Sequence, residues 1–155
     1  MKEHRYAIIV SRFNEHVTEK LLKGALERLA EKKIQDSDIT VIRVPGAVEI
    51  PLAAQLIAKK GRHSAIICLG AVIRGETSHY DSVCQQVSQG CQRVMLDYSI
   101  PVIFGILTTE NDEQALDRAG GTHGHKGKDA VDTAMEMAHL ASELTSDGSI
   151  SIGYY

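Results

Sequence analysis

The chain has 155 residues and a formal net charge of −3, because its 17 Lys and Arg residues are outnumbered by 20 Asp and Glu residues. This balance argues against a general affinity for nucleic acid. No apolar run approaches the roughly 20 residues that span a bilayer, so no membrane partner is expected either. We expect one domain over residues 1–144, followed by a polar tail at 145–155.

The cysteines and the N-terminal segment indicate a cytoplasmic protein. Cys68, Cys84 and Cys91 form no CxxC motif and lie in apolar or helical patterns. We therefore expect free thiols in a reducing compartment. The segment MKEHRYAIIVS contains only a very short apolar run, whereas a secretory signal needs a longer one and a small-residue cleavage site.

Strand-like and helix-like patterns alternate along the chain. Short apolar runs predict strands at 6–10, 39–44, 65–69 and 102–107. Apolar residues at helical spacing predict helices at 17–31, 48–59, 78–96, 112–118 and 128–144. The glycine-rich segment 120–127 is predicted to be a flexible link between the last two helices.

This alternation predicts the fold class. Strands that alternate with helices form right-handed βαβ units and a parallel sheet, and continuously apolar strands indicate that helices cover both faces. The predicted class is α/β, a flavodoxin-like three-layer sandwich with a four-stranded parallel sheet as its core. Ligands bind such sheets outside the carboxyl ends of the strands. The candidate site residues are therefore those that follow each strand.

The third predicted strand leads into Gly75-Glu76-Thr77-Ser78-His79 at the start of a helix. A helix start attracts phosphate, Gly75 lets the backbone come close, and the hydroxyls of Thr77 and Ser78 can donate. A helix start disfavours a protonated imidazole and a bound phosphate favours it, so His79 is suited to move protons near neutral pH. Alternatively, Thr77 or Ser78 caps the helix and His79 is an ordinary surface residue. Glu76 is unexpected beside an anion site.

Two other stretches follow strands. In VPGAVEIP, Pro45-Gly46 ends a strand and Glu49 falls in the first helical turn. Glu49 either interacts with the helix dipole or accepts hydrogen bonds from a polar ligand, with Val48 lining the pocket. In SRFNEH, Phe13 either stacks on a flat heterocycle or covers the core.

The stretch RAGGTHGHKG contains Arg118 and Lys126. Arginine suits bidentate phosphate binding and lysine provides a movable charge, but solvated charges around a glycine hinge are an alternative. His123 and His125 have no acidic or cysteine partner at ligand spacing, so no metal site is expected. Dinucleotide-binding, P-loop and GxSxG motifs are absent from the sequence.

Five stretches of the chain occur in the order and at the spacings of one enzyme family. They are RFN, VPGAVEIP, LGAVIRGETSHYD, PVIFGILTTEN and RAGGTHGHKG. From about Ala7 to Leu140 the chain resembles the 6,7-dimethyl-8-ribityllumazine synthases. The resemblance implies a transferase of riboflavin biosynthesis that needs no cofactor or metal. It would condense 5-amino-6-ribitylaminouracil with 3,4-dihydroxy-2-butanone 4-phosphate, releasing phosphate and water, in the penultimate step of that pathway.

The resemblance also implies residue roles. His79 would transfer protons. The substrate-binding set would be Phe13, Asn14, Ala47, Val48, Glu49, Ala71, Val72, Ile73, Phe104 and Lys126, with Phe13 stacked on the pyrimidine, Glu49 on the ribityl hydroxyls and Phe104 entering from an adjacent subunit. The phosphate-binding set would be Gly75, Glu76, Thr77, Ser78 and Arg118.

The resemblance further implies a homo-oligomer. Pentamers are expected, and some relatives assemble sixty subunits into a hollow capsid; the sequence leaves these two open. A flavin or lumazine carrier and a structural shell protein are rival interpretations. The chain departs from many relatives at Glu76, where a small residue is common, in the short segment before Tyr6, and in the tail TSDGSISIGYY.

Overall fold

The computed structural model describes residues 4–146, in which strands and helices alternate as predicted. The elements are β1 (Tyr6–Ser11), α1 (Glu15–Glu31), η1 (Asp36–Asp38), β2 (Ile39–Val44), η2 (Ala47–Glu49), α2 (Ile50–Lys60), β3 (Ala65–Ile73), α3 (His79–Tyr98), β4 (Val102–Thr109), α4 (Asp112–Asp117), β5 (Ala119–Gly121), β6 (Gly124–His125) and α5 (Lys126–Thr145).

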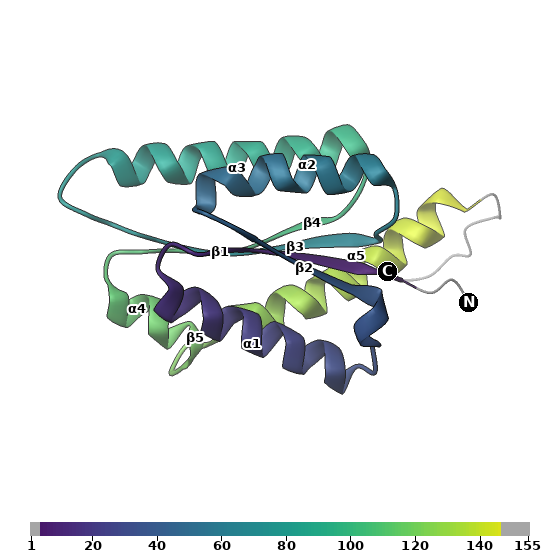
Figure 1. Ribbon diagram of the computed structural model, residues 1–155, viewed down its shortest axis with the longest axis horizontal. Helices are drawn as coiled ribbons and strands as arrows, with labels where there is room; N and C mark the ends of the chain where they lie inside the picture. The colour runs from purple at the N-terminus through teal and green to yellow at the C-terminus, as the bar shows by residue number, and fades with distance from the viewer. Residues whose placement is uncertain (1–3, 147–155) are drawn as a thin grey trace.

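The main sheet is parallel and has the strand order β2-β1-β3-β4. Helices α2 and α3 cover one face of this sheet, and α1, α4 and α5 cover the other (Figure 1). The predicted three-layer α/β sandwich with a four-stranded parallel sheet is confirmed.

Side chains that alternate along the strands form two cores, one on each face of the sheet. Ile8 on β1 packs with Leu21 and Val131 on the side of α1 and α5. Its neighbour Ile9 packs with Ile50 on the side of α2 and α3. Because β1 is buried on both faces, its uninterrupted apolar run is explained. Burying such a side chain contributes about 1.5–3 kcal/mol to the free energy of unfolding.

Two strands are longer than predicted. β3 continues from Leu69 to Ile73, and β4 continues to Thr109, because the two strands remain paired up to Ile73 and Thr109. Pairing between strands distant in sequence is not visible in local periodicity. As a result, the candidate residues 71–73 belong to the end of a strand rather than to the following loop.

The helix boundaries also shift. Helices α1 and α5 begin two residues before their predicted starts at 17 and 128. The predicted helix 48–59 divides into the 3₁₀ turn Ala47–Glu49 and α2 from Ile50.

The prediction of a flexible link at 120–127 is wrong. The segment forms an antiparallel hairpin of β5 and β6, and Lys126 is the first residue of α5. Gly120 has φ 108 and Gly124 has φ 85, values that glycine adopts without steric cost. The glycines thus permit a tight turn that holds the start of α5 in place.

Part of the predicted tail, 145–155, can be compared with the structure. Thr145 ends α5, and residues 147–155 lie outside the described range, so the domain boundary at 144 stays a prediction. Within residues 4–146, no helix combines the length and apolar character needed to cross a membrane.

Candidate active site

A cavity of about 420 Å³ lies at the carboxyl ends of β1, β2 and β3, on the side of α2 and α3. Its walls come from four separate segments, each of which follows or ends a strand. The predicted residues that line it are Phe13, Asn14, Ala47, Val48, Glu49, Ala71, Val72, Ile73, Gly75, Thr77 and His79. The fold thus brings most of the candidate residues together at the edge where parallel sheets bind ligands.

Phe13 is held at the rim of the cavity by its backbone. Its N–H donates to the carbonyl oxygen of Pro45 at 3.0 Å. The next residue, Asn14, adopts the left-handed conformation with φ 62, and its Nδ2 donates to the carbonyl oxygen of Ala71 at 2.9 Å. The Phe13 side chain is 71% exposed, so it does not cover the core and its ring is accessible to a ligand.

Glu49 belongs to the 3₁₀ turn after β2. Its N–H donates to the carbonyl oxygen of Gly46 at 3.2 Å, which fixes the turn that also presents Val48 to the cavity. The Glu49 side chain is exposed and lines the cavity. Its carboxylate can therefore accept hydrogen bonds from a polar ligand.

The loop 75–78 and His79 form a further wall. Ser78 makes no side-chain capping bond to α3, while Thr77 Oγ1 accepts from the His79 N–H at 3.3 Å. An added Cβ at Gly75 would meet no atom within 4 Å, so the space in front of it is open to a ligand. Glu76 and Ser78 are exposed and do not line the cavity.

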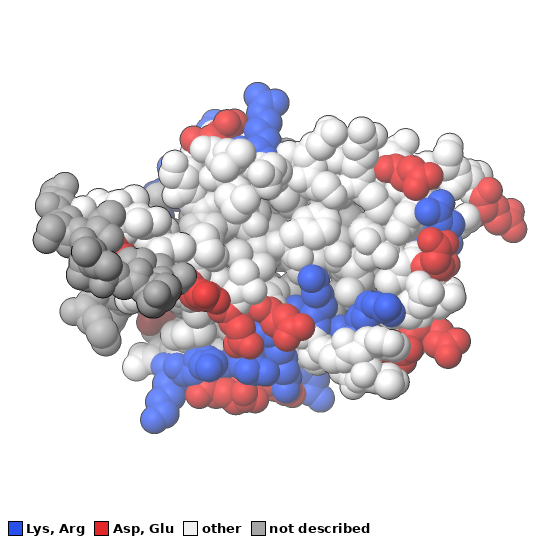
Figure 2. All heavy atoms as spheres, turned by 180° about the vertical axis from the view of Figure 1, so that it is seen from behind, with Lys and Arg blue, Asp and Glu red and all other residues white. Residues whose placement is uncertain are grey.

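Three predicted residues lie elsewhere. Arg118 and Lys126 line a second cavity of about 330 Å³, beside the end of β4 and the start of α5. Phe104 packs against the core below α3 and lines neither cavity. The view from behind faces the β4 edge. Basic and acidic side chains lie interspersed in its lower half, while the centre of its upper half has few charges (Figure 2).

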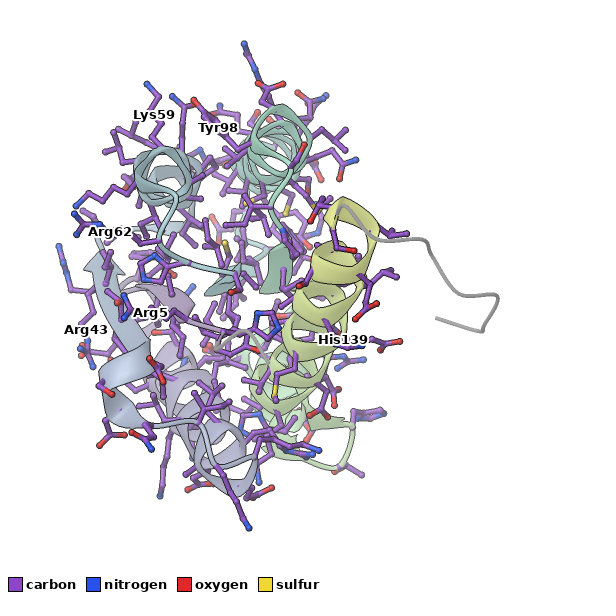
Figure 3. All side chains as sticks on the ribbon, turned by 90° about the vertical axis from the view of Figure 1, so that its right-hand side faces the viewer. Arg5, Arg43, Lys59, Arg62, Tyr98 and His139 are labelled. Atoms are coloured by element: carbon purple, nitrogen blue, oxygen red, sulfur yellow. The ribbon has the colours of Figure 1, made fainter. Side chains whose placement is uncertain are left out.

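The amino-terminal end of the sheet holds other charges. Arg5 and Arg62 lie there, with Lys59 on α2 and His139 on α5 (Figure 3). Burial lowers the pKa of the nearby His63, and Arg5 and Arg62 act in the same direction. No predicted site residue lies at this end of the described structure.

The sequence predicts no metal site at His123 and His125, and the structure gives these two side chains different surroundings. His123 lines the second cavity, whereas the Nδ1 atom of His125 accepts from the N–H groups of Gly127 and Lys128 and so caps α5. Among residues 4–146, no three or more histidine, cysteine, aspartate or glutamate side chains are grouped to hold a metal ion.

Comparison with known proteins identifies the family. A family model for 6,7-dimethyl-8-ribityllumazine synthase matches residues 3–142. The chain belongs to this family. A lumazine synthase of Coxiella burnetii (strain Dugway 5J108-111) is 57% identical over 140 residues, which are 90% of this chain and 93% of the relative. One of Salinibacter ruber (strain DSM 13855 / M31) is 51% identical over 141 residues, 91% of this chain and 90% of the relative.

The resemblance to lumazine synthases that the five motifs indicate is therefore confirmed. Tyr80 and Val83 also line the main cavity but were not among the predicted site residues; Gly46, which follows a predicted strand, lines it as well. Val83 lies four residues after His79 and so on the same side of α3, a spacing that could have predicted it. Tyr80 contacts Arg74, whose guanidinium lies 4.3 Å from the centroid of its ring, and burial raises the pKa of its phenol.

Proposed function

We propose that the chain condenses 5-amino-6-ribitylaminouracil with 3,4-dihydroxy-2-butanone 4-phosphate to form 6,7-dimethyl-8-ribityllumazine. This transferase reaction is the penultimate step of riboflavin biosynthesis. Membership of the lumazine synthase family supports it. The structural observation that supports it best is the single cavity that gathers Phe13, Glu49 and His79.

The reaction requires proton transfer and orientation. An amine of the pyrimidine attacks the ketone, water leaves and an imine forms. Phosphate is then eliminated, and the second amine closes the ring with loss of another water. We assign the proton transfers to His79, because it lies in the cavity beside the proposed phosphate loop. Holding the two reactants together would supply much of the remaining rate increase.

The binding roles follow from chemistry and position. The exposed ring of Phe13 is placed to stack on the pyrimidine, and Glu49 to accept from the ribityl hydroxyls. The open loop 75–78, at the start of α3, would bind the phosphate through its N–H groups and hydroxyls.

We propose that the site is completed by a second copy of the chain. Arg118, Lys126 and Phe104 lie outside the main cavity, and the first two line an exposed cavity beside β4. A neighbour whose β4 edge faces the main cavity would supply the missing cations.

Leu56 on α2 and Leu96 on α3 are 53% and 66% exposed, which is consistent with a contact surface between subunits. The expected assembly is a cyclic pentamer, alone or within a sixty-subunit capsid, and light scattering would distinguish the two.

A cytoplasmic location is also proposed. Cys68, Cys84 and Cys91 are all free thiols in the structure, as is usual for a protein in a reducing compartment. The two small-molecule substrates would be drawn from the cytoplasm as well.

A carrier that binds the heterocycle without converting it is the alternative, and His79 distinguishes the two functions. The purified protein is mixed with both substrates, and the absorbance of the lumazine product is followed. His79→Ala should lower kcat/KM by roughly 10²–10⁴-fold if the imidazole provides acid–base catalysis. His139→Ala is the matched control, since His139 is exposed on α5, across the sheet from the cavity.

A carrier would bind the product equally well with or without His79. A wild-type protein that forms no product above the uncatalysed rate would exclude the enzymatic function. A full-rate His79→Ala variant would exclude His79 as the proton-transfer residue.

A further inference from the structure

Arg74 connects three elements at the entrance to the loop 75–78. Its N–H donates to the carbonyl oxygen of Thr109 at 2.9 Å, which anchors it to the end of β4. Its Nε donates to Glu110 Oε2 at 2.8 Å, and its Nη2 lies 3.5 Å from Asp81 Oδ1. Its guanidinium also lies over the ring of Tyr80, 4.3 Å from the centroid. One planar group thus contacts the end of β4 and the first turn of α3 together.

Glu110, the ion-pair partner of Arg74 beside β4, is part of a hydrogen-bonded turn. The N–H of Glu110 donates to Gln114 Oε1 at 2.9 Å, and the N–H of Gln114 donates to Asn111 Oδ1 at 2.8 Å. Gln114 also accepts through its carbonyl oxygen from Arg118 Nη1 at 3.0 Å. Glu110 therefore belongs to a hydrogen-bonded turn at the start of α4, which holds its backbone beside Arg74.

Through these contacts Arg74 links the two ends of the proposed phosphate loop. The loop joins Arg74 to His79, and Arg74 in turn contacts Tyr80 and Asp81 just beyond the loop. The guanidinium therefore fixes the distance between the two ends of the loop. A four-residue segment with fixed ends has few conformations, so its N–H groups and the neighbouring imidazole are held ready for a ligand.

The geometry depends on arginine. A guanidinium is planar, donates in several directions and stacks flat on an aromatic ring, whereas a lysine ammonium is a single point charge. Arg74 is 39% exposed, and exposed ion pairs stabilise a fold only slightly. A large contribution to global stability is therefore not the expected role of this cluster.

We propose that Arg74 is a positioning residue, which acts through Asp81 and Tyr80 to hold the loop 75–78 and His79 in place. It does not line the main cavity, so it is not assigned contact with substrate. The proposal rests on the proposed function of this loop as the phosphate site.

The first test measures loop order without substrate. The N–H groups of Asp81 and Ser82 donate to the carbonyl oxygen of Ser78 at 3.1 and 3.4 Å, so their hydrogen exchange reports opening of the first turn. Arg74→Gln should speed exchange at these two amides by roughly 3- to 10-fold. Arg93→Gln is the matched control, because it removes the same charge from an exposed pair with Asp97 on α3.

The second test separates the two substrates. In Arg74→Gln, KM for the butanone phosphate should rise roughly 3- to 10-fold, while KM for the pyrimidine changes by less than about two-fold. Phe13 and Glu49, the residues proposed to bind the pyrimidine substrate, belong to other segments, so a general loss of fold would raise both values together. Arg74→Lys should recover only part of the effect, and Arg93→Gln should leave both KM values unchanged.

Unchanged exchange in Arg74→Gln, an equal rise of both KM values, or full recovery by Arg74→Lys would overturn the positioning role. If the wild-type protein forms no lumazine, the proposed function fails, and the exchange measurement still decides whether Arg74 orders the loop.

Discussion

Glu76 places a carboxylate inside the loop that we propose to bind phosphate. The side chain is exposed and does not line the main cavity, so it can turn toward water, but its charge remains near a bound anion. Repulsion between two like charges in water is modest and is screened by salt. The residue should therefore weaken phosphate binding without blocking it.

Replacing this charge tests that argument. Glu76→Gln should lower KM for the butanone phosphate by about two- to five-fold at low ionic strength, and the gain should shrink as salt is added. Glu136→Gln, which removes an exposed charge from α5, should change nothing. A higher KM in Glu76→Gln would mean that Glu76 supports the loop rather than repels the ligand.

The residues that follow strands were predictable one by one, because polar and glycine residues directly after apolar runs mark the ligand-binding edge of a parallel sheet. Phe13 and His79 were found in this way. Tyr80 was not, because its position depends on Arg74, which lies six residues away across the loop. Local patterns contain no information on such contacts.

At the scale of elements, the start of α5 explains why the glycine-rich segment 120–127 is ordered. His125 precedes α5, and its Nδ1 accepts from the Gly127 N–H at 3.1 Å and the Lys128 N–H at 3.3 Å. Its ring packs on α1, where an added Cβ at Gly24 would overlap it. The glycine-rich composition predicted flexibility. In the structure the glycines instead leave room for the His125 imidazole between α1 and α5.

This cap predicts a pH dependence of stability. Burial lowers the pKa of His125 below its ordinary value of 6.5, and Lys128 acts in the same direction. The unfolded chain therefore takes up a proton more readily than the folded protein as the pH falls through 6.5. The contribution of the cap is complete above that pH and is lost as the pH falls toward the lower pKa of the folded state. Protonated Nδ1 could not accept the two capping bonds.

The measurement is urea unfolding between about pH 7.5 and pH 5, above the range where most carboxylates titrate. His125→Asn keeps an oxygen acceptor at the cap but does not titrate. Its free energy of unfolding should fall less steeply with decreasing pH than that of the wild type. Some slope should remain, because burial also lowers the pKa of His63. Equal slopes in the two proteins would contradict the role given to His125.

At the scale of the whole molecule, the fold was predicted better than the site. The order of strands and helices follows from periodicity, and β3 and β4 were underestimated only where their mutual pairing extends them. The site set predicted from the family resemblance, however, is not gathered in one place. Most of it lines the main cavity and two residues line the second, while Glu76, Ser78 and Phe104 line neither. Sequence motifs do not show which residues share a cavity within one subunit and which face a neighbour.

That division gives the last prediction. In a ring, each proposed site combines the main cavity of one subunit with the Arg118 cavity of the next, a head-to-tail contact. His79→Ala and Arg118→Ala subunits should each be nearly inactive alone. When they are dissociated together and reassembled in equal amounts, a site is intact only where an Arg118→Ala subunit supplies the main cavity and a His79→Ala subunit supplies the cation. Random mixing therefore restores about one quarter of wild-type activity.

A mixture with the His79→Ala, Arg118→Ala double variant is the control, because no combination with either single variant yields an intact site. Light scattering before and after mixing verifies that subunits have reassembled. If the mixed single variants reassemble and stay inactive, Arg118 acts in the same subunit as His79, and the proposed sharing of sites is wrong. Recovery near one quarter would instead assign the two cavities to one active site, since neither subunit type alone contains both groups.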